Sequence, residues 1–286
     1  MGRWSWSCMV EHIVDHDVMS RYRQRYNLLC RRTYEDFNCE IEIKLGGNTS
    51  FRPMDESFFC KERKMSMERL MPDIPFDEVL HYLGCKEADE HLTNQIQTQI
   101  KRVKELAKPK VVYHISTIHG YDNDLKIPLH GKDIRELLKT CDQVIFMAAT
   151  LGTAIDVETK RLSLKDMGDM LVFDAVCNAG IEAFANDFQE ELAQKYAKQH
   201  RYLTDRFSCG YGDLRIDIQK TFCERLDTKR KIGLFVNESS LLIPLKSITA
   251  MIGISDKKQE KRISGCAYCD LKDTCELRKR GNRCGA

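Results

Sequence analysis

No run of apolar residues in this chain of 286 residues approaches the roughly 20 that a membrane-spanning helix needs. The N-terminus, MGRWSWSCMVEHIVDH, lacks the basic start and long apolar core of a secretion signal. The formal net charge is only +2, which gives no general argument for binding nucleic acid or a membrane surface. We therefore expect a cytoplasmic protein without a membrane or nucleic-acid partner.

Cysteine, by contrast, is abundant, with thirteen residues. Without a secretion signal, thiols or metal ligands are expected rather than disulfides. The polar C-terminal tail offers no core for its four cysteines, which are spaced Cys266-x2-Cys269-x5-Cys275-x8-Cys284. Four thiolates can close a tetrahedral zinc site or hold an iron–sulfur cluster. The spacing does not choose between the two metals, and four free thiols are the remaining alternative.

The chain divides into three segments, residues 1–66, 67–256 and 257–286. The first shows poor hydrophobic periodicity and no metal-site spacing of its cysteines. One hypothesis is that the natural start lies among Met65, Met67 and Met71; the alternative is an extension with a small fold of its own. The third segment is the cysteine-rich tail, in which we expect a bound metal.

The middle segment mixes helical and strand patterns. Helices are predicted at residues 76–83, 89–107, 131–138 and 169–196, with a short one at 222–226 that Asp217 could cap. Strands are predicted at residues 110–119, 143–149, 231–236 and 247–254. The strand at 143–149 is almost wholly apolar, which indicates burial on both faces.

The longest predicted helix, 169–196, carries one continuous apolar stripe at steps of three and four residues. Asp174 and Glu182 lie close to that stripe rather than on the outer face. A carboxylate beside a buried face usually has a partner. The residues alone indicate that Glu182 forms a salt bridge at the edge of the stripe.

A turn-prone segment places Arg206, Gly210 and Tyr211 in an R-x-x-x-G-Y cluster. Arginine can grip a carboxylate with two hydrogen bonds. Glycine permits a close backbone approach or a positive φ, and tyrosine adds an aromatic face with a hydroxyl tip. The set suits a small ligand with a carboxylate and a ring, although the pattern taken alone more often marks a surface turn with a solvated arginine.

In order, the short motifs resemble the activation domain of cobalamin-dependent methionine synthase, which binds S-adenosylmethionine (AdoMet). The resemblance covers about residues 71–256. Its matching residues are Ala148-Ala149-Thr150-Leu151-Gly152, Ile181-Glu182-Ala183-Phe184-Ala185, Arg206, Gly210-Tyr211, Asn237-Glu238-Ser239, Pro244 and Ser247-Ile248-Thr249-Ala250. The motifs are specific as an ordered set, although no single one is.

The resemblance implies an α+β fold, a twisted and mainly antiparallel sheet with flanking helices. It implies that Arg206 and Glu182 clamp the carboxylate and ammonium of AdoMet, with Gly210 and Tyr211 beside the ligand. It also implies a stand-alone reactivation factor, the activation component of a cobalamin-dependent methyltransferase, in which reduced cobalt is the nucleophile. No catalytic side chain is therefore expected.

The chain departs from the family pattern in three ways. Cys209 stands where proline often precedes the Gly-Tyr pair, and Lys257-Lys258 replace a tyrosine pair after the last strand. The D-x-H-x-x-G motif of the cobalamin-binding domain is absent, so a separate corrinoid-binding methyltransferase must carry the cobalamin. The electron would come from an iron–sulfur cluster in the tail, which we favour over zinc for this reason, or from a flavodoxin or ferredoxin-type donor.

Two other functions stay open from the sequence. One is a metal-containing interaction or sensor module that binds AdoMet without turnover. The other is an iron–sulfur protein that only passes electrons. AdoMet affinity separates the first of these from the second.

Overall fold

The computed structural model describes residues 28–32, 39–45, 48–52, 65–120 and 122–258. The chain forms two compact units, Met1–Glu62 and Arg63–Ala286. Within the first unit, β1 (Leu28–Arg32), β2 (Cys39–Leu45) and β3 (Asn48–Arg52) form an antiparallel sheet in that order. The candidate site lies in the second unit.

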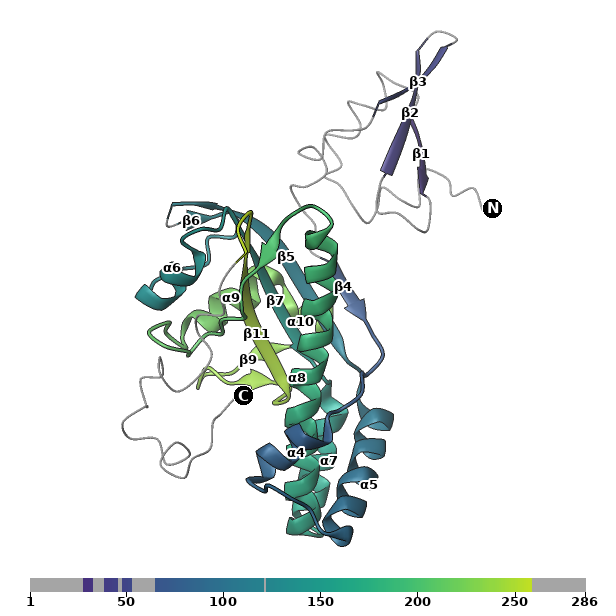
Figure 1. The fold of residues 1–286 in the computed structure, drawn as a ribbon, viewed down its shortest axis with the longest axis vertical. Coiled ribbons are helices and arrows are strands. Elements are labelled where there is room, and N and C mark those ends of the chain that lie inside the picture. The colour runs from purple at the N-terminus through teal and green to yellow at the C-terminus, as the bar shows by residue number, and fades with distance from the viewer. Residues whose placement is uncertain (1–27, 33–38, 46–47, 53–64, 121, 259–286) are drawn as a thin grey trace. The chain divides into compact units, whose positions relative to one another are not determined.

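An antiparallel sheet with strand order β4-β5-β7-β11-β8 organises the second unit (Figure 1). Its strands are β4 (Met65–Glu68), β5 (Lys110–His119), β7 (Gln143–Thr150), β11 (Ser247–Ser255) and β8 (Tyr202–Leu203). The short β6 (Asp122–Asn123) pairs with the end of β5. Lys110 pairs with Thr150, which in turn pairs with Ser247, so the three long strands are in register.

Helices cover both faces of this sheet, so side chains that alternate along each strand enter two different cores. On one face, Val111, Ile145 and Ile252 pack with Phe173 and Phe184 of α8 (Met167–Ala197). The helices α4 (Phe76–Leu83), α5 (Glu90–Leu106) and α7 (Thr153–Ser163) pack against α8 on this side.

The opposite face packs against α6 (Lys132–Leu138), α9 (Ile218–Leu226) and α10 (Thr228–Ile232). Here Val112, Phe146 and Met251 contact a core that includes Phe207 and Phe222. A small hairpin of β9 (Phe235–Val236) and β10 (Leu242–Ile243) follows α10. The mixed α+β fold with a mainly antiparallel sheet is therefore confirmed, as is the burial of β7 on both faces.

Two local signals set the ends of α4 and α5. Gly84 ends α4 with φ of 71°, and the Asp89 carboxylate accepts a hydrogen bond from the Leu92 amide at the start of α5. The apolar stripe of α8 is buried as expected, with Phe173, Phe184 and Phe188 fully enclosed. No helix in the described part of the chain has both the length and the apolar character to cross a membrane.

Two local predictions are wrong, and one helix was not predicted. Residues 153–163, which no pattern marked, form α7, and residues 228–232 are helical, so the predicted strand 231–236 shrinks to Phe235–Val236. Ile232 and Leu234 are both buried, which the helical turn achieves by ending at Gly233 with φ of 73°. Asp217 precedes α9 but makes no side-chain cap, because its carboxylate pairs with Arg215 instead.

Candidate functional site

One edge of α8 carries polar side chains directly beside the apolar stripe. These side chains, called here the polar edge of α8, are Asp174, Asn178, Glu182, Asn186 and Gln189. Their spacing of three and four residues places them on one face of the helix. Each of them bonds a cation from another part of the chain or a neighbouring polar side chain of that edge. The edge is thus a line of oxygen ligands that fixes two distant cations.

Arg206 is the cation at the C-terminal half of this edge. Phe207, its neighbour, exchanges two backbone hydrogen bonds with Met251 of β11 and buries its ring on the α9 side. Because side chains alternate across a sheet, Arg206 points to the α8 side. Its Nη2 lies 2.8 Å from Glu182 Oε2, and the exposed fractions of the two side chains are 16% and 37%.

Two amides complete the contacts of Arg206. Its Nη1 donates to Asn186 Oδ1 at 2.8 Å and to Gln189 Oε1 at 3.0 Å. The Gln189 amide nitrogen donates to the backbone oxygen of Thr204 at 3.2 Å. Arg206 is therefore held by one carboxylate and two amide oxygens on three successive turns of one helix.

Lys246 is the cation at the N-terminal half of the polar edge. Its Nζ lies 2.7 Å from both Asp174 Oδ1 and Asn178 Oδ1, and its side chain is largely buried. Nearby, burial raises the pKa of Asp156, which accepts a hydrogen bond from the Leu245 amide at 2.9 Å. The expected salt bridge of Glu182 is thus confirmed, and Asp174 also has the partner expected of a carboxylate beside a buried face.

Tyr82 of α4 adds an aromatic hydroxyl to the surroundings of the Arg206–Glu182 pair. Burial, reinforced by the negative charge of Glu182, raises the pKa of Tyr82 to about 12. The phenol is therefore protonated at neutral pH and can donate a hydrogen bond. The residue as a whole is 43% exposed, so it is accessible from solvent.

Gly210 and Tyr211 lie in the turn that follows Phe207. Gly210 has φ of 86°, one of the two roles the sequence predicts for it, and Ile216 packs where a side chain would stand. The ring of Tyr211 packs edge-on against Phe207, with 5.6 Å between centroids. The turn therefore joins the Arg206 site to the α9 side of the sheet, and the contacts that define the site come from α8.

Metal ligands do not gather in the described residues, where no group of three histidine, cysteine or acidic side chains could hold an ion. The four predicted ligands Cys266, Cys269, Cys275 and Cys284 lie outside the described residues. The described Cys141, Cys177, Cys209 and Cys223 are free thiols. Burial raises the pKa of Cys209 to about 12 and that of Cys223 to about 11, so these thiols are not nucleophilic at neutral pH.

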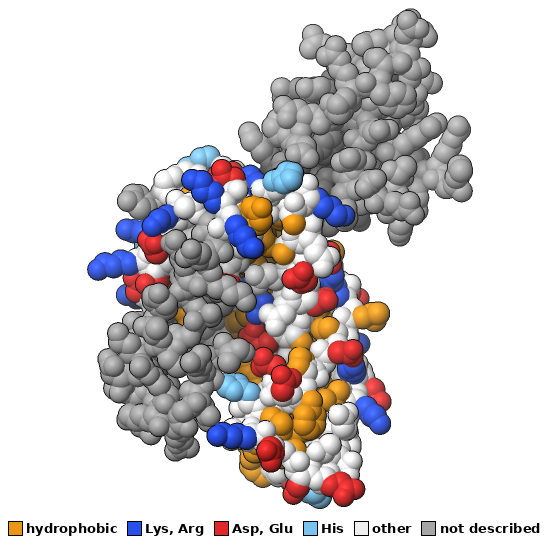
Figure 2. Space-filling model, viewed as in Figure 1, with side chains coloured by type: hydrophobic (Ala, Val, Ile, Leu, Met, Phe, Trp, Pro, Cys, Tyr) orange, Lys and Arg blue, Asp and Glu red, His pale blue; other side chains and the backbone are white. Residues whose placement is uncertain are grey.

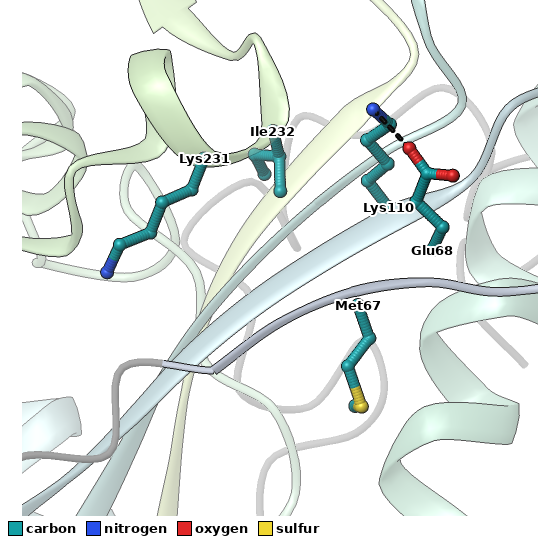
Figure 3. A pocket seen from close by; sticks show the side chains of 5 residues that line it. All are labelled: Met67, Glu68, Lys110, Lys231 and Ile232. Atoms are coloured by element: carbon teal, nitrogen blue, oxygen red, sulfur yellow. Dashed lines mark ion pairs between the residues drawn. The ribbon is translucent and has the colours of Figure 1, made fainter. Parts of the chain in front are cut away.

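A small hollow of about 130 Å³ lies between the β4 edge of the sheet and α10 (Figure 3). Lys110 and Glu68 form an ion pair at 2.6 Å on its wall, while the side chain of Lys231 extends away from that pair. Met67 and Ile232 complete the lining. The hollow shares no residue with the Arg206 site.

Hydrophobic side chains are exposed at the helical end of the second unit (Figure 2). Leu164, Met167 and Leu171, where α7 meets α8, have exposed fractions of 82%, 57% and 56%. At 1.5 Å per residue, Leu171 lies about 16 Å along the helix axis from Glu182. The apolar end of α8 and the Arg206 site are therefore separate surfaces.

Sequence reasoning brought together Arg206 and Glu182 but missed Asn186, Gln189 and Tyr82. The two amides could have been found, because they follow Glu182 at the four- and seven-residue spacing of one helix face. Tyr82 gave no such signal, since α4 precedes α8 by more than eighty residues in the sequence.

No protein-family model matches the chain, and none of the curated proteins compared with it does. Among solved structures, the chain is similar to the crystal structure of the MetH reactivation domain bound to AdoHcy. The TM-score is 0.47 and the sequence identity is 14%, with 77% of this chain and 87% of that chain covered.

Proposed function

We propose that this chain binds AdoMet at the Arg206 site and acts as a stand-alone reactivation factor for a separate corrinoid-dependent methyltransferase. The observation that carries the proposal is the Arg206–Glu182 pair, in which Nη2 and Oε2 are 2.8 Å apart. The two residues are 24 positions apart in the chain, and the ordered motifs of the sequence predict that they serve one ligand.

An α-amino acid is a zwitterion, and a partly exposed ion pair offers it one group of each sign. The guanidinium of Arg206 can receive the α-carboxylate of AdoMet through paired hydrogen bonds. The second oxygen of Glu182 can receive the α-ammonium. The partly exposed Tyr82 supplies an apolar wall that ends in a hydrogen-bond donor. The donor set therefore fits AdoMet.

In the proposed role the protein positions AdoMet against the corrinoid of its partner. The substrate is an inactive cob(II)alamin, which is reduced by one electron from a separate donor. The methyl group then leaves the sulfonium sulfur for the reduced cobalt, and AdoHcy is released. Fixing the donor in reach of the acceptor can supply several kcal/mol of the barrier lowering, and no side-chain base is required.

The partner in this proposal is a corrinoid-binding methyltransferase, with a flavodoxin or ferredoxin-type protein as electron donor. An iron–sulfur cluster on Cys266, Cys269, Cys275 and Cys284 would let the chain supply the electron itself, whereas zinc there would be structural. The cytoplasm is the proposed location.

The binding site is tested by titration calorimetry of AdoMet into the full chain and into Arg206→Ala. Losing two charge-assisted hydrogen bonds should weaken binding by about 100-fold or more, while the circular dichroism spectrum stays close to that of the unaltered chain because the fold is kept. Arg206→Lys keeps the charge but loses the paired N–H donors of the planar guanidinium, so it should weaken binding as well. Arg215→Ala, at an exposed arginine paired with Asp217, is the control that should change nothing.

Unchanged AdoMet affinity in Arg206→Ala would remove Arg206 from the site, and no AdoMet affinity in the unaltered chain would end the proposal. A second measurement separates activation from sensing. Methylation of a corrinoid protein's cob(II)alamin under reducing conditions should depend on this chain. AdoMet binding without that dependence would instead favour the sensor module.

A further inference from the structure

Two amide side chains hold the same nitrogen of Arg206. Nη1 carries two hydrogens, and it donates to Asn186 Oδ1 at 2.8 Å and Gln189 Oε1 at 3.0 Å. Nη2 donates to Glu182 Oε2 at 2.8 Å. None of the described residues accepts a hydrogen bond from Nε. Of the five N–H groups of the guanidinium, Nε–H and the second N–H of Nη2 are thus left for a ligand.

The orientation of Gln189 is fixed from its other end. Its amide nitrogen donates to the Thr204 backbone oxygen at 3.2 Å, so its oxygen must face Arg206. Thr204 is itself tied to β11, because its amide donates to the Gly253 oxygen and its hydroxyl accepts from the Gly253 amide at 2.8 Å. The position of Nη1 is therefore set by the sheet through Thr204 and Gln189.

We propose that Asn186 and Gln189 are positioning residues that decide which donors of Arg206 meet the α-carboxylate of AdoMet, an inference that rests on the proposed function. With Nη1 occupied, the carboxylate binds to the remaining donors on Nε and Nη2. Glu182 keeps its place on Nη2 and turns its other oxygen to the α-ammonium. Without the two amides the guanidinium rotates about its side-chain bonds, and the paired geometry with the carboxylate is lost.

The test compares AdoMet with decarboxylated AdoMet, which lacks only the group that Arg206 is to bind. Dissociation constants for both ligands are measured by calorimetry with the unaltered full chain, Asn186→Leu, Gln189→Leu and Arg206→Ala. Gln194→Leu is the matched control, since Gln194 lies on the same helix and bonds Glu190 instead of Arg206.

The unaltered chain should prefer AdoMet by at least about tenfold, because a charge-assisted hydrogen bond is worth at least that factor. In Asn186→Leu and Gln189→Leu, AdoMet affinity should fall about tenfold while affinity for the decarboxylated ligand stays within about twofold. Gln194→Leu should keep the preference of the unaltered chain, and Arg206→Ala should lose it.

Three results would overturn the inference. An unchanged preference in both leucine variants would mean that the amides do not act on the carboxylate. Equal weakening of both ligands would mean that the amides only support the fold. Equal affinity of the unaltered chain for the two ligands would mean that no carboxylate is recognised. Each of these is distinct from a failure of the unaltered chain to bind AdoMet at all, which would end the proposed function and this inference together.

Discussion

At the scale of single residues, the missing side chain of Gly253 lets neighbouring side chains pack closely against β11. A Cβ at this position would lie 2.5 Å from Cys141 Sγ, 2.9 Å from Leu138 Cδ2 and 3.0 Å from Thr204 Cγ2. Thr204 also supports Gln189, so the space at Gly253 bears on the Arg206 site. The absence of a side chain here is a packing requirement rather than a conformational one.

Gly253→Ala should lower the free energy of unfolding by about 2–3 kcal/mol, because three fixed neighbours must move. Urea denaturation of the variant and the unaltered chain measures this change in the free energy of unfolding. Gly233→Ala is the comparison: its φ of 73° is strained for alanine, but nothing lies within 4 Å of the added Cβ, so its cost should be about 1 kcal/mol. Combining Gly253→Ala with Cys141→Ala should recover part of the loss. Equal costs at the two glycines would contradict the packing argument.

At the scale of elements, a buried carboxylate joins α5 to α7. Glu158 is 7% exposed and accepts two hydrogen bonds from Arg161, each of 2.7 Å. Arg102 of α5 also pairs with it. These guanidinium groups hold the pKa of Glu158 below its usual range. The carboxylate is therefore charged in the folded protein at neutral pH.

Glu158→Gln should destabilise the protein by about 2–3 kcal/mol, because both arginines lose a charged acceptor. Glu105→Gln, at an exposed position of α5, should change the free energy of unfolding by less than about 0.5 kcal/mol. Chemical denaturation of both variants gives the two values. A cost no larger for Glu158 than for Glu105 would show that the helices are held by their apolar contacts alone.

The elements also show what the sequence could predict. Long periodic segments such as α8 and β7 were found because their patterns extend over many residues. The helix at 153–163 was not predicted, and the predicted strand 231–236 is helical up to Ile232. The first of these helices also contacts a residue far along the chain, since Asp156 accepts a hydrogen bond from the Leu245 amide. In the candidate site, Glu182 and Arg206 came from ordered motifs, whereas Tyr82 depends on how α4 crosses α8, which no local pattern encodes.

At the scale of the whole molecule, buried thiols make stability depend on alkaline pH. Burial raises the pKa of Cys141 to about 11, of Cys223 to about 11 and of Cys209 to about 12. The unfolded chain releases these protons near pH 9, before the folded chain does. The stabilising contribution of the protonated buried thiols is therefore complete below about pH 9 and is lost as the pH rises toward their pKa values in the folded protein.

Urea denaturation in reducing buffer should thus give a constant free energy of unfolding up to about pH 8.5 and a falling one above pH 9. Each thiol adds at most about 1.4 kcal/mol per pH unit to the slope, and the partly exposed Cys141 adds less than the other two. Cys223→Ala should make the decline shallower. A free energy of unfolding that stays level to pH 10 would contradict this account.

The uninterrupted course of α8 has a consequence for how this protein can vary in evolution. The Lys246 and Arg206 contacts stand on the two halves of a single helix, with Asn178 as the last ligand of one cation and Glu182 as the first of the other. One inserted or deleted residue between them would turn everything beyond it by about 100° and break the alignment of one cation with its ligands. The number of residues between the two ligands, 179–181, is therefore fixed.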